Sequence, residues 1–181
     1  MLLTFMACST TTRKANQADS TNSDTVYSIS TRQLKSDKIP DSVFRMTKLR
    51  HLAISGMDCD YGDNKNCWGI SKIPKEIKNL KDLTTIRLTV DAIAVIPFEL
   101  TELKKLKLFD LSDNAGLTSF DNIAKCGSLE FLYLHGCGLT KLPDNIGDLK
   151  NLKELGLMGN NIDKTEQKRI KKALPNCIIK F

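Results

Sequence analysis

The sequence predicts an α/β solenoid, a stack of short repeats that share one parallel β-sheet and carry short helical turns on the opposite side. Two observations predict this fold class. Aliphatic residues begin similar units every 23 residues, at Leu83, Leu106, Leu129 and Leu152. Within each unit the apolar spacing changes from two residues, which is typical of a strand with one buried face, to three, which is typical of a tight helical turn.

The length of 181 residues is that of one ordinary domain, which excludes a large multidomain enzyme. With 41% hydrophobic and 27% charged residues, the composition is that of a globular protein and excludes a wholly disordered chain and a membrane bundle. Lysine and arginine number 27 against 21 acidic residues. The resulting formal charge of +6 permits an anionic partner without requiring one.

Six units align on their first apolar residue. They begin at Val26, Leu49, Leu83, Leu106, Leu129 and Leu152. The interval from Leu49 to Leu83 is 34 residues, which is one unit of 23 plus an insertion of 11, at about residues 58–68. Prolines keep the same register and follow one aliphatic position, at Pro40, Pro74, Pro97 and Pro143. These coincidences indicate internal repeats, which cannot bury their apolar faces alone and therefore stack.

The unit Leu129-x-x-Leu132-x-Leu134-x-x-Cys137-x-Leu139 resembles the signature of the leucine-rich repeat (LRR) family. The resemblance runs from residue 26 to about 162 and implies a short curved horseshoe, with the parallel sheet on its concave side and 3₁₀ or short helices on its convex side. Residues 163–181 resemble the C-terminal helical cap of bacterial members, because Ile170 and Leu174 lie four apart on one helical face. Residues 26–181 are therefore interpreted as one LRR domain.

Residues 1–25 are interpreted as a signal remnant followed by a disordered tether. Phe5-Met6-Ala7-Cys8 resembles a bacterial lipobox, in which the cysteine is acylated, and the polar stretch that follows is too poor in apolar residues to bury a core. The chain thus resembles exported LRR lipoproteins of the Bacteroidetes type, which implies a place in the cell envelope, at the outer membrane or the cell surface. In the alternative, Cys8 is unmodified, since no basic residue precedes Arg13.

The insertion is the feature that stacking does not require. Cys59 and Cys67 flank a short polar loop, and in an exported chain they are expected to form a disulfide. Calcium binding by Asp58, Asp60 and Asp63 is an alternative, although the EF-hand spacing is absent. Trp68 is expected to pack the base of the insertion onto the repeats, and its alternative role is an exposed anchor for a partner.

Catalytic chemistry finds little support in the sequence. Cys126, Cys137 and Cys177 occupy positions where a small buried thiol is expected. The two histidines, His51 and His135, fall at outward positions three units apart and cannot form one couple. We find no nucleophile elbow, phosphate loop or zinc motif, so the sequence predicts no enzyme, no metal and no cofactor.

Alternate strand residues point away from the core and give the outward columns of the sheet. One column is expected to contain Ser28, His51, Thr85, Leu108, Phe131 and Glu154; the next Ser30, Ala53, Arg87, Asp110, Tyr133 and Gly156; and the third Arg32, Ser55, Thr89, Ser112, His135 and Met158. Four of these form an apolar and aromatic cluster, namely Leu108, Phe131, Tyr133 and Met158. Their polar rim is Arg87, Asp110, His135 and Glu154. This composition predicts a binding site, unless the rings lie flat on the sheet or the cap covers them.

The LRR resemblance implies a non-enzymatic module that binds a protein, or a glycan, through the concave sheet. A structural envelope protein that associates with itself is the first alternative, and an enzyme or an enzyme-associated effector is a second. The lysines alternate with structural positions around the outer turns and are mixed with acids, so we expect no nucleic-acid partner. Membrane contact is expected only through a lipid anchor, and the oligomeric state stays open.

Overall fold

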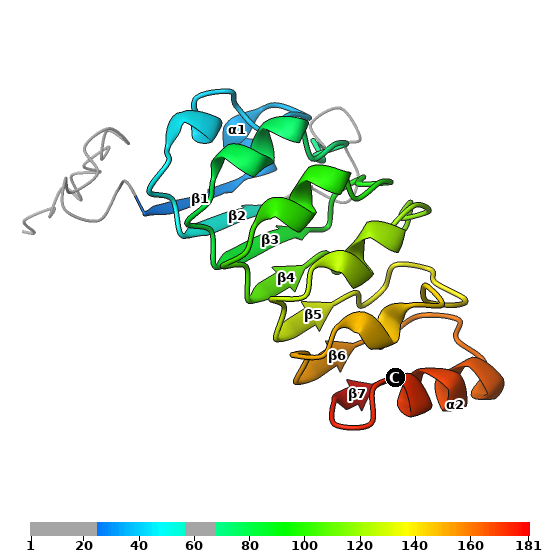
Figure 1. Cartoon of the computed structure of the whole chain (residues 1–181). Helices are drawn as coiled ribbons and strands as arrows, with labels where there is room; N and C mark the ends of the chain where they lie inside the picture. The colour runs from blue at the N-terminus through cyan, green and yellow to red at the C-terminus, as the bar shows by residue number, and fades with distance from the viewer. Residues whose placement is uncertain (1–24, 57–67) are drawn as a thin grey trace, which may run out of the picture.

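The computed structural model describes residues 25–56 and 68–181. Within these ranges seven strands form one parallel sheet, in the order in which they occur in the chain. Helical turns lie along one side of this sheet (Figure 1). The strands are β1 (Val26–Ser30), β2 (His51–Ser55), β3 (Thr85–Thr89), β4 (Leu108–Asp110), β5 (Phe131–Tyr133), β6 (Glu154–Gly156) and β7 (Ile178–Lys180). The helical segments are α1 (Thr31–Leu34), η1 (Val43–Arg45), η3 (Lys75–Asn79), η4 (Phe98–Glu102), η5 (Asp121–Lys125), η6 (Ile146–Asp148) and α2 (Lys164–Ala173), where η marks a 3₁₀ helix.

The core is a ladder of aliphatic side chains between the sheet and the helical turns. In register across the sheet, Leu52, Ile86, Phe109, Leu132 and Leu155 are all buried. The helical turns close the other side with a second buried series, Val43, Ile77, Leu100, Ile123 and Ile146. Full burial of one such side chain contributes about 1.5–3 kcal/mol, and each side chain reaches it only because a neighbouring repeat covers it.

Buried polar side chains fasten the turns that follow the strands. Asn114 donates through Nδ2 to the carbonyls of Leu88 and Leu111, both at 2.8 Å, and its Oδ1 accepts the Ile93 amide at 2.9 Å. Asn160 makes the same three bonds in its own repeat. In the repeat between them Cys137 takes this position, and its thiol contacts the Leu111 carbonyl at 3.2 Å. Each turn is thereby tied to the preceding repeat.

The cap is formed by the helix α2, as the sequence predicts, and by the strand β7. Asp163 begins α2 and accepts the Glu166 amide at 2.8 Å, while Ile170 and Leu174 are buried against the last repeat. Arg169 forms an ion pair with Glu166 at 2.7 Å. The chain then returns as β7, which pairs with β6 and extends the sheet by one strand.

The expected register of the first repeat is wrong by two residues. In the structure Val26, Ser28 and Ser30 align with His51, Ala53 and Ser55, whereas the constant interval of 23 aligns Ser28 with His51 and Ser30 with Ala53. The cause is α1, a helical turn that adds two residues between the strand and Ile39. Ser30 caps this turn by accepting the Gln33 amide, and Arg32 belongs to it, so Arg32 does not lie beside Ser55.

Candidate binding surface on the open face of the sheet

We call the sheet surface that carries no helical turns the open sheet face. From β2 to β6 its columns have the expected register. The corrected columns are Val26, His51, Thr85, Leu108, Phe131, Glu154 and Ile178, followed by Ser28, Ala53, Arg87, Asp110, Tyr133, Gly156 and Lys180. The structure therefore adds Ile178 and Lys180 of β7 to a surface that the sequence interpretation ended at β6.

Apolar side chains gather on the C-terminal half of this face. Leu108 and Phe131 are register partners and are both half-buried. Ile178 lies in the same column beyond Glu154 and is 64% exposed. Met158, which follows β6, is 50% exposed. All four predicted apolar residues thus lie on β4 or β5 or shortly after β6, and β7 extends the patch.

Two rings stack above a glycine. The rings of Tyr133 and His135 have centroids 5.9 Å apart and lie nearly parallel, at 16°. A Cβ at Gly156 would come within 2.8 Å of Tyr133 Cδ1 and closer still to the imidazole of His135. The Met158 amide donates to His135 Nδ1 at 3.1 Å, which fixes the imidazole. The rings do lie over the sheet, as the alternative to binding supposes, but both remain partly exposed.

Charged groups border this patch. Glu154 forms an ion pair with Lys180 at 2.7 Å, and the hydrogen bond from Lys180 lowers the pKa of the Glu154 carboxyl. Burial is the main cause of the raised pKa of Tyr133, with the Glu154 carboxylate adding to it. On the other side Asp110 accepts hydrogen bonds from the amide and hydroxyl of Ser112, at 3.0 and 2.7 Å. Arg87 is exposed and is the register partner of Asp110. The predicted rim therefore carries both signs of charge.

Several predicted residues lie outside the described ranges. They are Cys8, the proposed disulfide pair Cys59 and Cys67, and the acids Asp58, Asp60 and Asp63. Trp68 is described and is 39% exposed, so it is less buried than the packing role requires. Cys126 and Cys137 are buried free thiols, as expected, whereas Cys177 is only partly buried.

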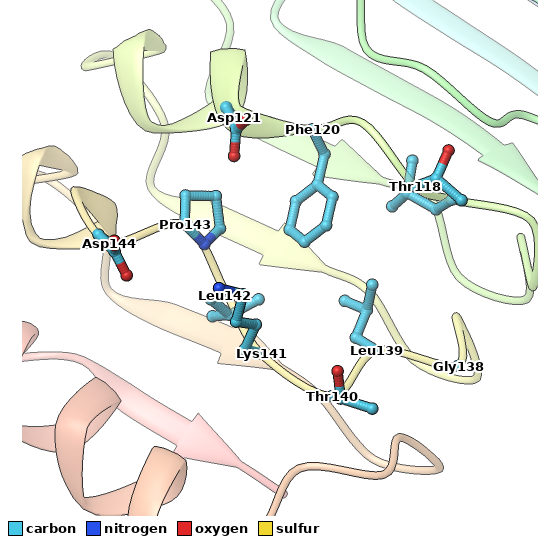
Figure 2. A pocket seen from close by; sticks show the side chains of 11 residues that line it. Thr118, Phe120, Asp121, Gly138, Leu139, Thr140, Lys141, Leu142, Pro143 and Asp144 are labelled. Carbon is cyan, nitrogen blue, oxygen red and sulfur yellow. The ribbon is translucent and has the colours of Figure 1, made fainter.

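Apart from the open sheet face, the structure has a hollow of about 450 Å³ between residues 117–121 and 138–144 (Figure 2). The Phe120 ring points toward Leu139 and Leu142, and the carboxylates of Asp121 and Asp144 lie at one end. None of the predicted site residues lines it. Phe120 stands where other units have the aliphatic residue and proline, and the loss of that proline was the available sequence signal. The acids at its end, Asp121 and Asp144, are exposed.

The described residues contain neither a membrane-spanning helix nor a metal-binding cluster. In residues 25–56 and 68–181, no helix has both the length and the apolar character needed to cross a membrane. Over the same ranges, no three His, Cys, Asp or Glu side chains are grouped so that they could hold a metal ion.

Comparisons with known proteins follow the same repeats. The Leucine Rich Repeat family model matches residues 128–149. The chain is 34% identical over 137 residues to the volume-regulated anion channel subunit LRRC8B of Mus musculus, and 28% identical over 129 residues to the disease resistance-like protein DSC1 of Arabidopsis thaliana. These matches cover 72% and 69% of this chain but only 16% and 10% of those proteins.

Among solved structures, an LRR protein of Leptospira interrogans is 32% identical, with a TM-score of 0.68 over 80% of this chain and 34% of its own. The repeat model falls on the strand, turn and 3₁₀ helix of one unit, and the structural match extends over most of the stack. The chain carries leucine-rich repeats, and its fold is an LRR solenoid.

Proposed function

We propose that the chain is a non-enzymatic binding module that holds a protein ligand on the open sheet face. The observation that carries this proposal is the patch of Leu108, Phe131, Tyr133, Met158 and Ile178 with its charged rim. Stacking determines the inward residues but places no demand on these outward ones. Partly exposed aromatic and aliphatic groups surrounded by charges are the composition of a protein-binding hot spot.

The comparisons support the general part of this proposal. LRR proteins act broadly in protein–protein interaction, and the sheet gives such a chain a rigid row of side chains from several repeats. A glycan is the second ligand class, because the Tyr133 ring could stack on a sugar face. We favour protein because the patch is flanked by aliphatic Leu108 and Ile178 and extends along four strands, from β4 to β7.

The test is a double substitution on the patch. Phe131→Ser with Tyr133→Ser should lower the affinity for a partner isolated by crosslinking at least tenfold, because the central aromatic groups of an interface contribute most of its binding energy. Phe98→Ser is the matched control, since Phe98 is 58% exposed on η4, on the other side of the sheet. Equal affinity of the double variant and the wild type, with both folded, contradicts the site. A glycan array on the same variants separates the two ligand classes.

Self-association is the alternative use of the same patch. A dimer that buries Phe131 and Tyr133 would compete with ligand binding. Sedimentation velocity over a hundredfold range of protein concentration tests it. A dimer that is lost in the double variant and kept in Phe98→Ser would favour the structural envelope protein.

We further propose that the chain is exported and anchored to a bacterial envelope through an acylated Cys8. The support is the Phe5-Met6-Ala7-Cys8 sequence, followed by a polar stretch suited to a tether. Metabolic labelling with a palmitate analogue should mark the wild type and leave Cys8→Ser unmarked. Equal labelling of both would exclude acylation of Cys8. Export also favours a Cys59–Cys67 disulfide, which would appear as a two-dalton mass difference on reduction.

A further inference from the structure

Asp91 occupies the position that asparagine takes in two other repeats. Asn114 and Asn160 each accept, through Oδ1, the backbone amide of the residue 21 positions earlier, at 2.9 Å. Asp91 accepts the amide of Ile70, also 21 positions earlier, at 2.8 Å. The three side chains therefore have the same placement, and only the second atom of the terminal group differs between them.

That second atom has opposite hydrogen-bonding character in the two residue types. The Nδ2 of Asn114 donates to the carbonyl of Leu111, three residues earlier, and to Leu88 in the neighbouring strand. Leu88 stands three residues before Asp91 and is the register partner of Ile54, so by the same placement we expect Oδ2 of Asp91 to face the carbonyls of Leu88 and Ile54. Oδ2 is buried and, within the described residues, has no hydrogen-bond partner. An ionised carboxylate has no proton to donate to a carbonyl. In the charged form, a buried negative oxygen would therefore lie against carbonyl oxygens that are themselves partly negative.

We propose that in mildly acidic solution Asp91 is a neutral acid in the folded protein, which donates a proton from Oδ2 to a main-chain carbonyl as the asparagine amide does, and that its ionisation loosens the turn formed by residues 89–92. The chemistry is a reversible loss of one proton to water, so no other reactant is needed. Burial raises the pKa of this carboxyl to about 6, although the hydrogen bond from Ile70 acts in the opposite direction.

The turn at 89–92 fastens both ends of the inserted segment. The amide of Gly56 donates to the carbonyl of Thr89 at 2.9 Å, and the amide of Ala92 donates to Ile70 at 3.0 Å. Val90 has a φ of 56°, a left-handed conformation that a β-branched residue rarely adopts. The turn therefore combines a left-handed β-branched residue with a buried acid. The proton therefore controls how firmly Gly56 and Ile70 are held.

The described surroundings contain few other charges. Of the segments against Asp91, residues 54–56 and 68–70 carry no titratable side chain, and the next turn carries the exposed Asp113. Burial and the Ile70 amide are the influences on the Asp91 carboxyl that the described residues provide. The segment 57–67 itself contains Asp58, Cys59, Asp60, Tyr61, Asp63, Lys65 and Cys67. Every variant below keeps these residues, so their titration cancels in the comparison.

The sign of the pH effect follows from the raised pKa. The folded protein holds this proton more tightly than the unfolded chain, so the contribution of Asp91 is fully present below pH 4 and is lost as the pH rises through about 6. Asp91→Asn supplies a permanent donor. We expect its melting temperature to match that of the wild type at pH 4 and to exceed it by several degrees at pH 8. The carboxyl carbon of Asp91 should titrate near pH 6 by NMR.

Two further variants test the placement. Asn114→Asp transfers the same group to the next repeat and should introduce a second loss of melting temperature between pH 4 and pH 8. Asp113→Asn removes a neighbouring exposed carboxylate and should change nothing. Amide exchange of Ile70 and Ala92, corrected for the intrinsic pH dependence, should accelerate above pH 6 in the wild type but not in Asp91→Asn. A difference between wild type and Asp91→Asn that is the same at pH 4 and pH 8, or an Asp91 carboxyl that titrates near pH 4, overturns the proposal.

Discussion

Gly156 is the single residue that sets how the aromatic groups lie on the open sheet face. Its missing side chain leaves room for the rings of Tyr133 and His135, which would otherwise meet a Cβ. The glycine is therefore present for space, since its φ is not in the left-handed region. The same packing gives the two rings one orientation before any ligand arrives, which lowers the ordering cost of binding.

Gly156→Ala should displace these rings. We expect a loss of about 1 kcal/mol in the free energy of unfolding, because the His135 hydrogen bond with the Met158 amide breaks when the imidazole moves. Urea denaturation gives the stability, and near-ultraviolet circular dichroism reports the Tyr133 environment. Gly127→Ala is the control, because a Cβ there has no neighbour within 4 Å. If both variants behave alike, the rings do not depend on Gly156.

Individual inward and outward residues could be predicted from the sequence wherever the interval of 23 is kept. The register from β3 to β6 follows from it, because each strand is short and has one buried face, and the register of β2 with β3 follows once the eleven inserted residues are subtracted. The stacking of Tyr133 on His135 could not be predicted, since it depends on side-chain rotamers. The ionic partner of Glu154 was missed because Lys180 comes from the cap, whose strand has no place in the repeat pattern.

Among the elements, α2 does more than cover the last repeat. Arg169 donates to the carbonyl of Leu142 at 2.9 Å, and Glu166 accepts the Leu142 amide at 2.9 Å. Both backbone groups of one residue are thus satisfied by an ion pair on the cap helix. In a longer stack, the next repeat would supply hydrogen-bond partners for such backbone groups. Here the cap helix supplies them instead.

Replacing Arg169 by Met should weaken this attachment while keeping the apolar stem. We expect a loss of about 1–3 kcal/mol, since the carbonyl of Leu142 loses its side-chain donor and the Glu166 carboxylate loses its ionic partner. Chemical denaturation and the exchange rate of the Leu142 amide measure it. Lys168→Met, an exposed position of the same helix, should have no effect. Unchanged exchange at Leu142 in Arg169→Met would show that α2 is held by Ile170 alone.

In the first repeat, the repeat pattern does not predict the position of the strand β1 correctly. The pattern fixed Ile39 and Pro40 correctly relative to the later units, but it placed β1 two residues out of register. The missing information was local: Ser30-x-x-Gln33 is a capping box, and it begins the helical turn α1. A terminal unit has a neighbour on one side only, so local chemistry can override the period there.

For the molecule as a whole, ion pairs between neighbouring repeats form a second, outer set of links. Glu130 lies between Lys107 at 2.9 Å and Lys153 at 2.6 Å, and Lys105 pairs with Asp82. Several basic side chains are therefore paired with acids along the stack, and the formal charge of +6 is the excess that such pairing does not remove. Such exposed pairs contribute little one by one, and their effect is seen in how stability depends on pH and salt.

Acid should loosen the stack. Hydrogen bonds from Lys107 and Lys153 lower the pKa of Glu130 to about 2, and Lys81 and Lys105 lower the pKa values of Glu102 and Asp82. The folded state binds these protons less tightly than the unfolded chain, so the contribution is present above pH 5 and is lost as the pH falls toward 2. Melting temperatures from pH 7 to pH 2 should therefore decline below pH 5, and less steeply in Glu130→Gln. A flat profile below pH 5 would contradict this role for the ion pairs.

The order of the strands has a consequence for how such a chain can change in evolution. Each strand pairs only with its neighbours in sequence, from β1 to β7. Thr85, Leu108, Phe131 and Glu154 mark three successive steps of 23 residues, so duplicating one step adds a strand with the same kind of contacts and lengthens this outward row of side chains by about 4.8 Å. The length of this row thus depends on the number of repeats, which unequal recombination can change while the cap and the first repeat stay as they are.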